Sequence, residues 1–284
     1  MKRGIERREF VRVLAGAGIA VACSGNRVKA TTSGPRRLDR VGIQLYTVRD
    51  QMKADFEGTL AKIAEIGYKE VEFAGYFDHP AAEVRAILDR HGLSAPSTHV
   101  AFESDDQWKA ALDTARTVGH EYIVMPWIPE ERRKTLDDWK NFAQTFNHAG
   151  QMARDAGIQF AYHNHDFEFP RIEGQVPYDV LLQSTDPRLV QLEIDLYWIT
   201  KAGQDPLTYF ARWPGRIPLV HVKDSMGAPE HKMVDVGRGT IDWKRIFAKK
   251  DQAGIKHFFV EHDQPPQPFE DIAVSYRYLH GLEF

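Results

Sequence analysis

The feature of this sequence that most constrains its fold is an eightfold alternation between short apolar stretches and longer amphipathic ones. The apolar stretches predict strands and the amphipathic stretches predict helices. The predicted strands cover residues 41–47, 69–74, 93–100, 121–127, 158–165, 189–195, 217–224 and 257–263. The predicted helices cover residues 54–66, 80–91, 105–118, 136–156, 178–184, 206–212, 243–253 and 269–282. Glycine follows five of these helices, where a helix C-cap belongs, at residues 67, 92, 119, 157 and 254.

Eight strand–helix units in about 245 residues predict a (β/α)8 barrel, or TIM barrel. We expect it to form a single α/β domain over residues 41–284. The chain has 284 residues, of which 43% are hydrophobic, so it can bury a large core. A doubly wound sheet is the competing fold, but it requires a glycine-rich phosphate loop after the first strand. Residues 44–50, QLYTVRD, contain no glycine, so we favour the barrel.

Residues 1–30 are predicted to be a twin-arginine-type signal peptide, which implies export to the periplasm. Arg7 and Arg8 precede the weakly hydrophobic stretch 13–22, and Ala30 completes a small-residue cleavage site. A basic amphipathic helix is the alternative interpretation, but glycines within the stretch weaken it.

The one cysteine of the chain, Cys23, lies inside the predicted signal peptide, so no internal disulfide is expected. A lipoprotein anchor on Cys23 is a less favoured alternative, because Ala20 stands where a lipoprotein signal usually has leucine. Residues 31–40, which contain TTSGPRR, are predicted to be a linker.

The net charge of the chain beyond residue 30 limits the classes of partner that it can bind. Residues 1–30 carry seven of the 37 Lys and Arg residues and two of the 40 Asp and Glu residues, which leaves a net charge of −8 beyond them. Such an acidic chain is a poor match for nucleic acid. No apolar run reaches the roughly 18 residues of a membrane span. A small carbohydrate is the expected partner, and assembly into a homo-oligomer stays open.

Polar residues collect at the carboxyl ends of the predicted strands. In a (β/α)8 barrel all of these ends lie on the face that carries active sites. The strand-end residues are Glu72, His99, His163, His165, Glu193, Asp195, His221, Lys223, Glu261 and His262. Because side chains alternate along a strand, residues 163 and 165, 193 and 195, and 221 and 223 are predicted to point the same way in pairs.

Four of these residues are expected to converge from consecutive strands on one divalent metal ion: His163, Asp195, His221 and Glu261. Two imidazoles and two carboxylates suit Mn²⁺, Co²⁺, Fe²⁺ or Zn²⁺ better than Ca²⁺, which prefers oxygen ligands alone. We favour Mn²⁺, with Co²⁺, Fe²⁺, Mg²⁺ and Zn²⁺ as alternatives. Without a metal the two carboxylates would repel each other, which would raise their pKa. Taken singly, each residue has an ordinary alternative as a hydrogen-bonded strand end.

The sequence resembles the sugar phosphate isomerase/epimerase family of xylose-isomerase-like TIM barrels. The resemblance rests on VGIQLYTVRD, AEIGYKEVEF, EIDLYW, LVHVKD, VGRGTIDW and FFVEHD, and covers nearly all of the chain beyond the signal peptide. It implies one divalent metal held by Glu, Asp, His and Glu at the ends of strands five to eight. Asp195, His221 and Glu261 match three of these positions.

The fourth position departs from the family pattern. Many members read ENH at the end of strand five, whereas this chain reads HNH, so His163 replaces the glutamate. Family epimerases use two metal-bound glutamates as paired acid and base groups, which puts two-base epimerisation in doubt here. Inosose dehydratases of the same family also have a histidine-rich end of strand five and remove water next to a ketone, which favours elimination.

The expected reaction begins with removal of a proton from carbon beside a carbonyl, through a metal-stabilised enediolate. Glu261 is the expected base, and His165 or His163 would shuttle the proton or protonate a leaving group. The residues expected to bind substrate are Glu72, His99, Glu168, Lys223, Arg238, Trp127 and Trp198.

Several of these substrate-binding roles have plain alternatives. Glu168 could cap the turn after its strand, and Lys223 could pair with a carboxylate. Arg238, in the loop 235–239, offers a fork for a carboxylate or phosphate. The two tryptophans would stack on a sugar face, or else pack at the rim.

Reprotonation of the enediolate would make the protein an isomerase or epimerase, the first interpretation. Expulsion of a β-oxygen would make it a lyase or dehydratase acting on keto-sugars or 3-keto-glycosides. Two other classes stay open: a Schiff-base aldolase using Lys223, and a non-catalytic sugar-binding protein.

Overall fold

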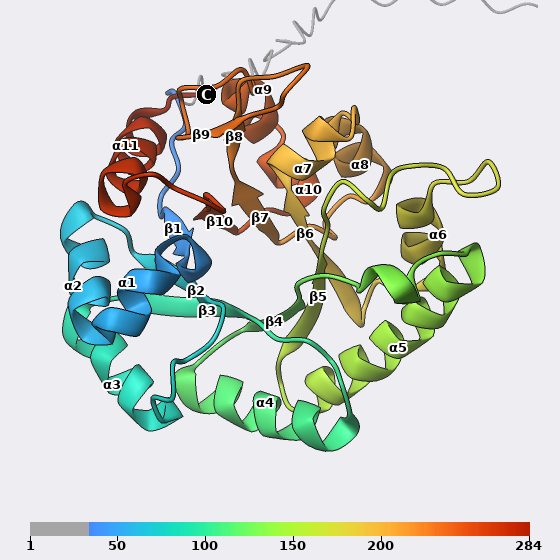
Figure 1. Ribbon diagram of the computed structural model, residues 1–284, viewed down its shortest axis with the longest axis horizontal. Helices are drawn as coiled ribbons and strands as arrows, with labels where there is room; N and C mark the ends of the chain where they lie inside the picture. The colour runs from blue at the N-terminus through green and yellow to red at the C-terminus, as the bar shows by residue number, and fades with distance from the viewer. Residues whose placement is uncertain (1–33) are drawn as a thin grey trace, which may run out of the picture. The chain divides into compact units, whose positions relative to one another are not determined.

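Eight parallel strands close into a barrel in the structure, a computed structural model that describes residues 34–284 (Figure 1). The barrel strands are β1 (Gly42–Gln44), β2 (Glu70–Phe73), β3 (Ser94–His99), β4 (Tyr122–Met125), β5 (Gln159–His163), β6 (Val190–Asp195), β7 (Leu219–Val222) and β10 (His257–Val260). Each strand pairs with its neighbours in chain order, and β10 pairs with β1 to close the ring. The predicted TIM barrel is therefore confirmed.

Helices surround the strands on the outside of the barrel (Figure 1). They are α1 (Arg49–Ala54), α2 (Phe56–Ile66), α3 (Ala81–His91), α4 (Asp105–Val118), α5 (Leu136–Asp155), α6 (Pro177–Ser184), α7 (Leu196–Lys201), α8 (Pro206–Arg212), α9 (Trp243–Phe247), α10 (Lys250–Ala253) and α11 (Pro268–Gly281). Short 3₁₀ helices cover Leu45–Val48 and Glu130–Arg132. α5 begins at a capping box, in which Thr135 and Asp138 satisfy each other's backbone N–H groups.

Several local features differ from the sequence prediction, and the helices α1 and α7 were not predicted. The first strand ends at Gln44 rather than at residue 47, because the Gln44 side chain accepts the N–H of Tyr46 at 3.0 Å and the backbone turns into a 3₁₀ helix. The helix predicted over 243–253 is split into α9 and α10. A short antiparallel hairpin, β8 (Asp224–Ser225) with β9 (Met233–Val234), was not predicted.

The interior of the barrel is layered. One layer is an apolar cluster formed by Tyr122, Val124, Ala161, Leu219 and Phe259. Gly42 is required beside it, since a Cβ atom there would lie 2.6 Å from the Phe259 ring. Two residues beyond Ala161, Leu219 and Phe259, the same strand faces carry His163, His221 and Glu261. The layer above the apolar cluster is therefore polar.

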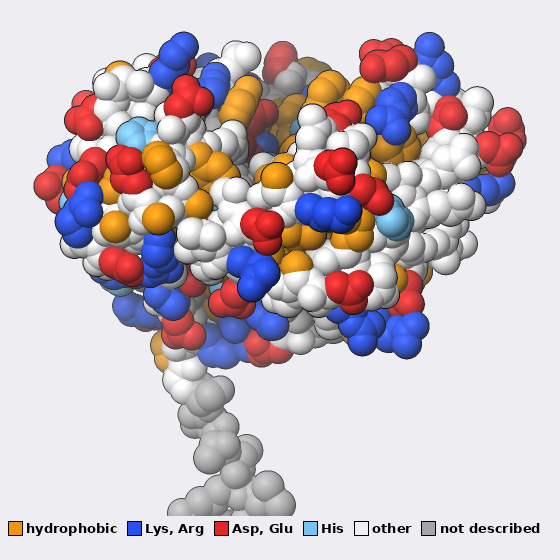
Figure 2. Space-filling model, turned by 90° about the horizontal axis from the view of Figure 1, so that it is seen from below, with side chains coloured by type: hydrophobic (Ala, Val, Ile, Leu, Met, Phe, Trp, Pro, Cys, Tyr) orange, Lys and Arg blue, Asp and Glu red, His pale blue; other side chains and the backbone are white. Residues whose placement is uncertain are grey.

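The predictions for residues 1–30, including the signal peptide and Cys23, lie outside the described residues. Within the predicted linker, Arg36 exchanges two 3.0 Å backbone hydrogen bonds with Phe284, and Leu38 is buried. The part of this segment that the structure describes thus packs on the barrel. None of the helices within 34–284 is long and apolar enough to cross a membrane. On the face drawn in Figure 2, Lys and Arg side chains are interspersed with Asp and Glu.

Candidate metal centre

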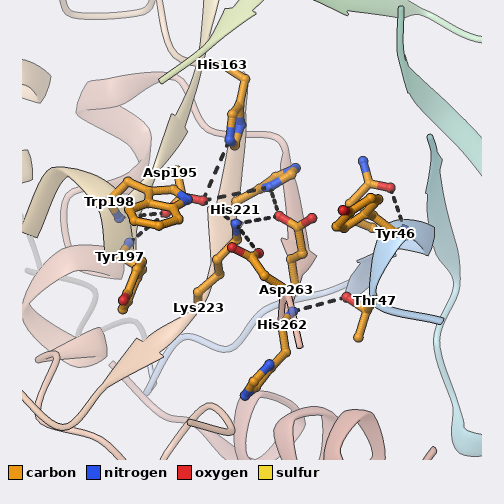
Figure 3. Close-up of polar contacts among 12 residues, drawn as sticks. Tyr46, Thr47, His163, Asp195, Tyr197, Trp198, His221, Lys223, His262 and Asp263 are labelled. Carbon is orange, nitrogen blue, oxygen red and sulfur yellow. Dashed lines mark hydrogen bonds and ion pairs between the residues drawn. The ribbon is translucent and has the colours of Figure 1, made fainter. Parts of the chain in front are cut away.

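Three of the four predicted metal ligands meet at the polar end of the barrel. Ligand atoms of Asp195, His221 and Glu261 all lie within 4.8 Å of one another. His221 Nδ1 lies 2.7 Å from Glu261 Oε2 and 4.0 Å from Asp195 Oδ2. His163, the fourth, places Nε2 3.7 Å from Asp195 Oδ2 (Figure 3). The structure therefore brings all four side chains to one place.

Bonds of about 2.0–2.2 Å around a tetrahedral or octahedral ion separate its ligand atoms by roughly 2.8–4.4 Å. The separations of 3.7 and 4.0 Å from Asp195 Oδ2 fit the ligand shell of one divalent cation. The 2.7 Å between His221 Nδ1 and Glu261 Oε2 is a hydrogen bond that a bound cation would replace. Asp195 Oδ1 accepts the backbone N–H groups of Tyr197 and Trp198 at 2.9 and 2.8 Å. Asp195 Oδ2 is buried and accepts no well-aligned hydrogen bond from residues 34–284. That oxygen could serve as a ligand atom for a cation.

Lys223 supplies positive charge at the same place. Its Nζ lies 3.0 Å from Asp195 Oδ2 and 2.7 Å from Glu261 Oε2, and 2.9 Å from Asp263 Oδ1 (Figure 3). Burial would lower the pKa of Lys223, but the three carboxylates outweigh it and raise that pKa well above its ordinary value. A Schiff-base aldolase needs a neutral amine, so this charged side chain weighs against that alternative.

A second group of ligand-type atoms lies next to the first. It comprises His99, His163, Glu193 and His221, with one ligand atom of each within 4.8 Å of the others. Glu193 Oε2 lies 3.0 Å from His163 Nδ1 and 2.7 Å from His99 Nε2. Glu72 Oε2 lies 2.6 Å from His221 Nε2. Each of the two metal-site histidines is thus held by a fully buried glutamate through the nitrogen that faces away from Asp195.

Sequence reasoning did not assign Glu193 to the site. The available signal was its position two residues before Asp195, which places both side chains on the inner face of β6. Gln44 was also missed; it donates to Glu72 Oε2 at 2.8 Å and so belongs to the same buried network. Asp263, the last residue of the predicted eighth strand, was not singled out either and is a partner of Lys223.

A cleft of about 520 Å³ opens above these groups and has the size of a small-molecule site. Several predicted site residues line it, namely His99, Trp127, His163, His165, Lys223 and Glu261. Trp127 is 49% exposed at its edge. Trp198 lies beside the site, with its ring centroid 5.5 Å from that of His165. Tyr46 and Arg49 also line the cleft, although the sequence did not single them out.

Three predicted substrate-binding residues lie elsewhere. Glu72 is fully buried in the histidine network and not in the cleft. Glu168 is also fully buried, and its two oxygens accept Tyr162 Oη–H at 2.7 Å and the His165 N–H at 3.0 Å. Burial raises the pKa of Glu168 to about 8. Because Glu168 is fully buried and both of its oxygens accept hydrogen bonds from the protein, it anchors the segment after β5 and does not face a sugar in the cleft. Arg238 lines a different cleft and pairs with Asp235 at 2.8 Å.

Comparison with known proteins agrees with the barrel fold and with a polar site at the carboxyl ends of its strands. The profile of the xylose isomerase-like TIM barrel family matches residues 60–279. An inosose dehydratase from Lacticaseibacillus casei is 27% identical over 265 residues, covering 79% of this chain and 88% of that protein.

Solved structures with the same fold give a similar result. A sugar phosphate isomerase/epimerase from Parabacteroides distasonis ATCC 8503 superposes with a TM-score of 0.76 at 27% identity, covering 86% of this chain and 98% of that one. An IOLI protein with a binding zinc atom superposes with a TM-score of 0.68 at 16% identity, covering 84% and 95% of the two chains. The second likeness is one of fold.

Proposed function

The chain belongs to the xylose isomerase-like TIM barrel family, and from that premise we propose that it is a divalent-metal-dependent enzyme acting on a keto-sugar. In its first step it removes a proton from a carbon atom next to the carbonyl group. We further propose that a lyase outcome, the loss of a β-oxygen, follows this step. An isomerase or epimerase outcome is the second candidate.

The observation that carries the proposal is the buried Oδ2 of Asp195, which accepts no well-aligned hydrogen bond from residues 34–284 although the Lys223 ammonium lies 3.0 Å away. It lies next to a sugar-sized cleft that His163, Lys223 and Glu261 line. His163, His221 and Glu261 surround it at cation-ligand spacings. A divalent cation held by these residues would polarise the carbonyl group and stabilise the negative charge that develops on its oxygen. Mn²⁺ remains our first choice, and Zn²⁺ is supported by the same donor set and by the zinc-containing structural neighbour.

His165 is the proposed proton acceptor. It lines the cleft, and its Nδ1 is buried with no hydrogen-bond partner within residues 34–284. Burial, and next the charge of Lys223, lower its pKa to about 3, so the ring is neutral near neutral pH. The proposed role rests on its place in the cleft and on the free Nδ1.

The structure favours a ligand role for Glu261 over the base role expected from sequence. Although burial alone would raise its pKa, Lys223 and His221 bring the pKa of Glu261 well below its usual range. Such a carboxylate is ionised and lies 2.7 Å from both the Lys223 ammonium and the His221 ring, which suits it to hold a cation.

His99 is the proposed proton donor. It also lines the cleft, and its Nε2 lies 2.7 Å from Glu193 and 3.2 Å from Glu72. Burial would lower its pKa, but the two glutamates prevail and raise it to about 9, so the ring is protonated near neutral pH. A neutral and a charged imidazole on one cleft suit elimination, in which one group takes a proton and another protonates the departing oxygen.

Family relatives support both candidate outcomes. Elimination agrees with the inosose dehydratase relatives. Isomerisation agrees with the structural neighbour from Parabacteroides distasonis, and the same deprotonation would serve it. His163 stands at the position where family epimerases have their second glutamate, so a matched pair of carboxylate bases is missing from this end of β5.

Incubation of the purified protein with Mn²⁺, ketohexoses and 3-keto-glucosides in D₂O tests the proposal. Release of water or an aglycone, followed by mass spectrometry, is the expected result and identifies a lyase. Deuterium incorporated at one carbon without loss of a group identifies an isomerase or epimerase. Tight sugar binding without exchange after metal addition would contradict the proposal and favour a non-catalytic sugar-binding protein.

A further inference from the structure

We propose that a second cleft, next to the candidate metal centre, binds the second sugar unit of a two-unit glycosidic substrate. This inference rests on the proposed function, because it extends the substrate of the same site. The second cleft has a volume of about 460 Å³. It is lined by the β8–β9 hairpin, the loop 235–238, the segment after β10 and Asp271 of α11.

The two clefts share one wall. Asp263 and Gln264 line both of them. In Figure 3 the Asp263 side chain points toward Lys223, whereas His262 points away from it. Asp263 thus reaches the metal centre while it lines both clefts, and His262 lines the second cleft only. A ligand that crosses this two-residue wall would contact the metal centre with one unit and the second cleft with the other.

The loop that carries Arg238 is held in place by one buried carboxylate. Asp224, 1% exposed, accepts the N–H groups of Gly237 at 2.9 Å and Gly239 at 3.2 Å, and Trp243 Nε1–H at 3.0 Å. A Cβ atom at Gly239 would lie 2.1 Å from Asp224, so glycine is needed for this approach. The second cleft therefore has a preformed wall, and less conformational entropy is lost when a ligand binds to it.

The charges of this cleft favour a neutral ligand rich in hydroxyl groups. Its basic residues are Lys232 and Arg238, and its acidic residues are Asp235, Asp263 and Asp271. The Arg238 guanidinium already pairs with Asp235 at 2.8 Å, so no surplus of positive charge awaits a phosphate. Apolar surface comes from Met233, Val234 and Pro266. Polar groups of both kinds beside apolar side chains match the hydroxyls and the ring face of a second sugar.

Binding of 3-keto-cellobiose and of 3-keto-glucose to the full chain with Mn²⁺ tests this inference by calorimetric titration. We expect the two-unit sugar to bind at least about tenfold more tightly, since a second ring adds several hydrogen bonds of roughly 1 kcal/mol each. Arg238→Ala should weaken the two-unit sugar about fivefold and leave the one-unit sugar within twofold. Arg238→Trp, which fills the cleft from an exposed position, should abolish the preference. Arg188→Ala is the matched control, because Arg188 is an exposed arginine paired with Asp186 and lies outside both clefts.

Equal affinities for the two sugars, or an equal effect of Arg238→Trp on both, would overturn the inference, as would binding of neither sugar. Competition by inorganic phosphate would point to an anion site instead and would also overturn it. Failure of the proposed function is a separate outcome. The two-unit sugar would then bind with the expected preference, and no deuterium would enter it in D₂O.

Discussion

Replacing Glu193 by glutamine is expected to weaken metal binding although Glu193 is not among the four proposed ligands. Glu193 is fully buried, and its Oε2 lies 3.0 Å from His163 Nδ1, which leaves Nε2 directed toward Asp195. Burial, and next the charge of Glu72, raise the pKa of Glu193 to about 7, so the comparison is made at pH 8. There the glutamine side chain keeps the shape but removes the negative charge that fixes this orientation and increases the basicity of the ring.

The size of the effect follows from the role of a carboxylate behind a ligating histidine. Loss of such a partner typically costs about 10–100-fold in metal affinity, which corresponds to roughly 1.4–2.7 kcal/mol. Glu193 also contacts His99 at 2.7 Å and His221 at 3.3 Å, so we expect the upper part of this range.

The assay is chelator competition with Zn²⁺ or Mn²⁺ on metal-free protein, with circular dichroism to show that the variant is folded. Glu70→Gln is the matched control. Glu70 is a buried glutamate at the start of β2 that pairs with a histidine, His257, at 2.8 Å. The control should bind metal within twofold of wild type. Unchanged affinity in Glu193→Gln, or an equal loss in Glu70→Gln, would refute the orienting role.

Three further predictions concern Lys223, His165 and Glu168. Lys223→Met leaves two buried carboxylates without their cation, so the metal-free variant should lose roughly 3 kcal/mol of unfolding free energy in urea titration; Mn²⁺ should restore more stability to it than to wild type, and equal gains would contradict this. His165→Gln should lower the rate of deuterium exchange about 10²–10⁴-fold with unchanged metal content by elemental analysis; unchanged exchange would remove its role as base. The pKa of Glu168 is raised from 4.5 to about 8, so the folded state binds more protons between these values and wild-type stability should fall as pH rises through that window. Glu168→Gln should flatten this part of the urea-derived stability profile, and an unchanged slope would refute the assignment.

The barrel itself was accessible from the sequence because each strand and helix carries its own pattern. Strand ends were also predictable, since parallel strands bring their carboxyl ends to one face, and residue spacing of two places His221 above Leu219 and Glu261 above Phe259. This is why the four proposed ligands were found together.

The sequence could not show how deeply each polar side chain is buried or which residue it contacts. Glu72 and Glu193 both follow the strand pattern, but only coordinates place them beneath the cleft with no exposed surface. Glu168 looks like a cleft residue because it follows a strand end, yet the backbone folds it inward to Tyr162. Arg238 was predicted to bind substrate but lines the second cleft instead. Its position is set by a long-range contact between Asp224 and the loop 235–239. Such contacts depend on tertiary packing and leave no local pattern.

The most direct test of the central claim is anomalous diffraction from crystals of the full chain loaded with Mn²⁺ or Zn²⁺. One anomalous peak is predicted among Asp195, His221, Glu261 and His163, with the Lys223 ammonium withdrawn toward Asp263. A cleft without such a peak, in which Lys223 still bridges Asp195 and Glu261, would contradict the account.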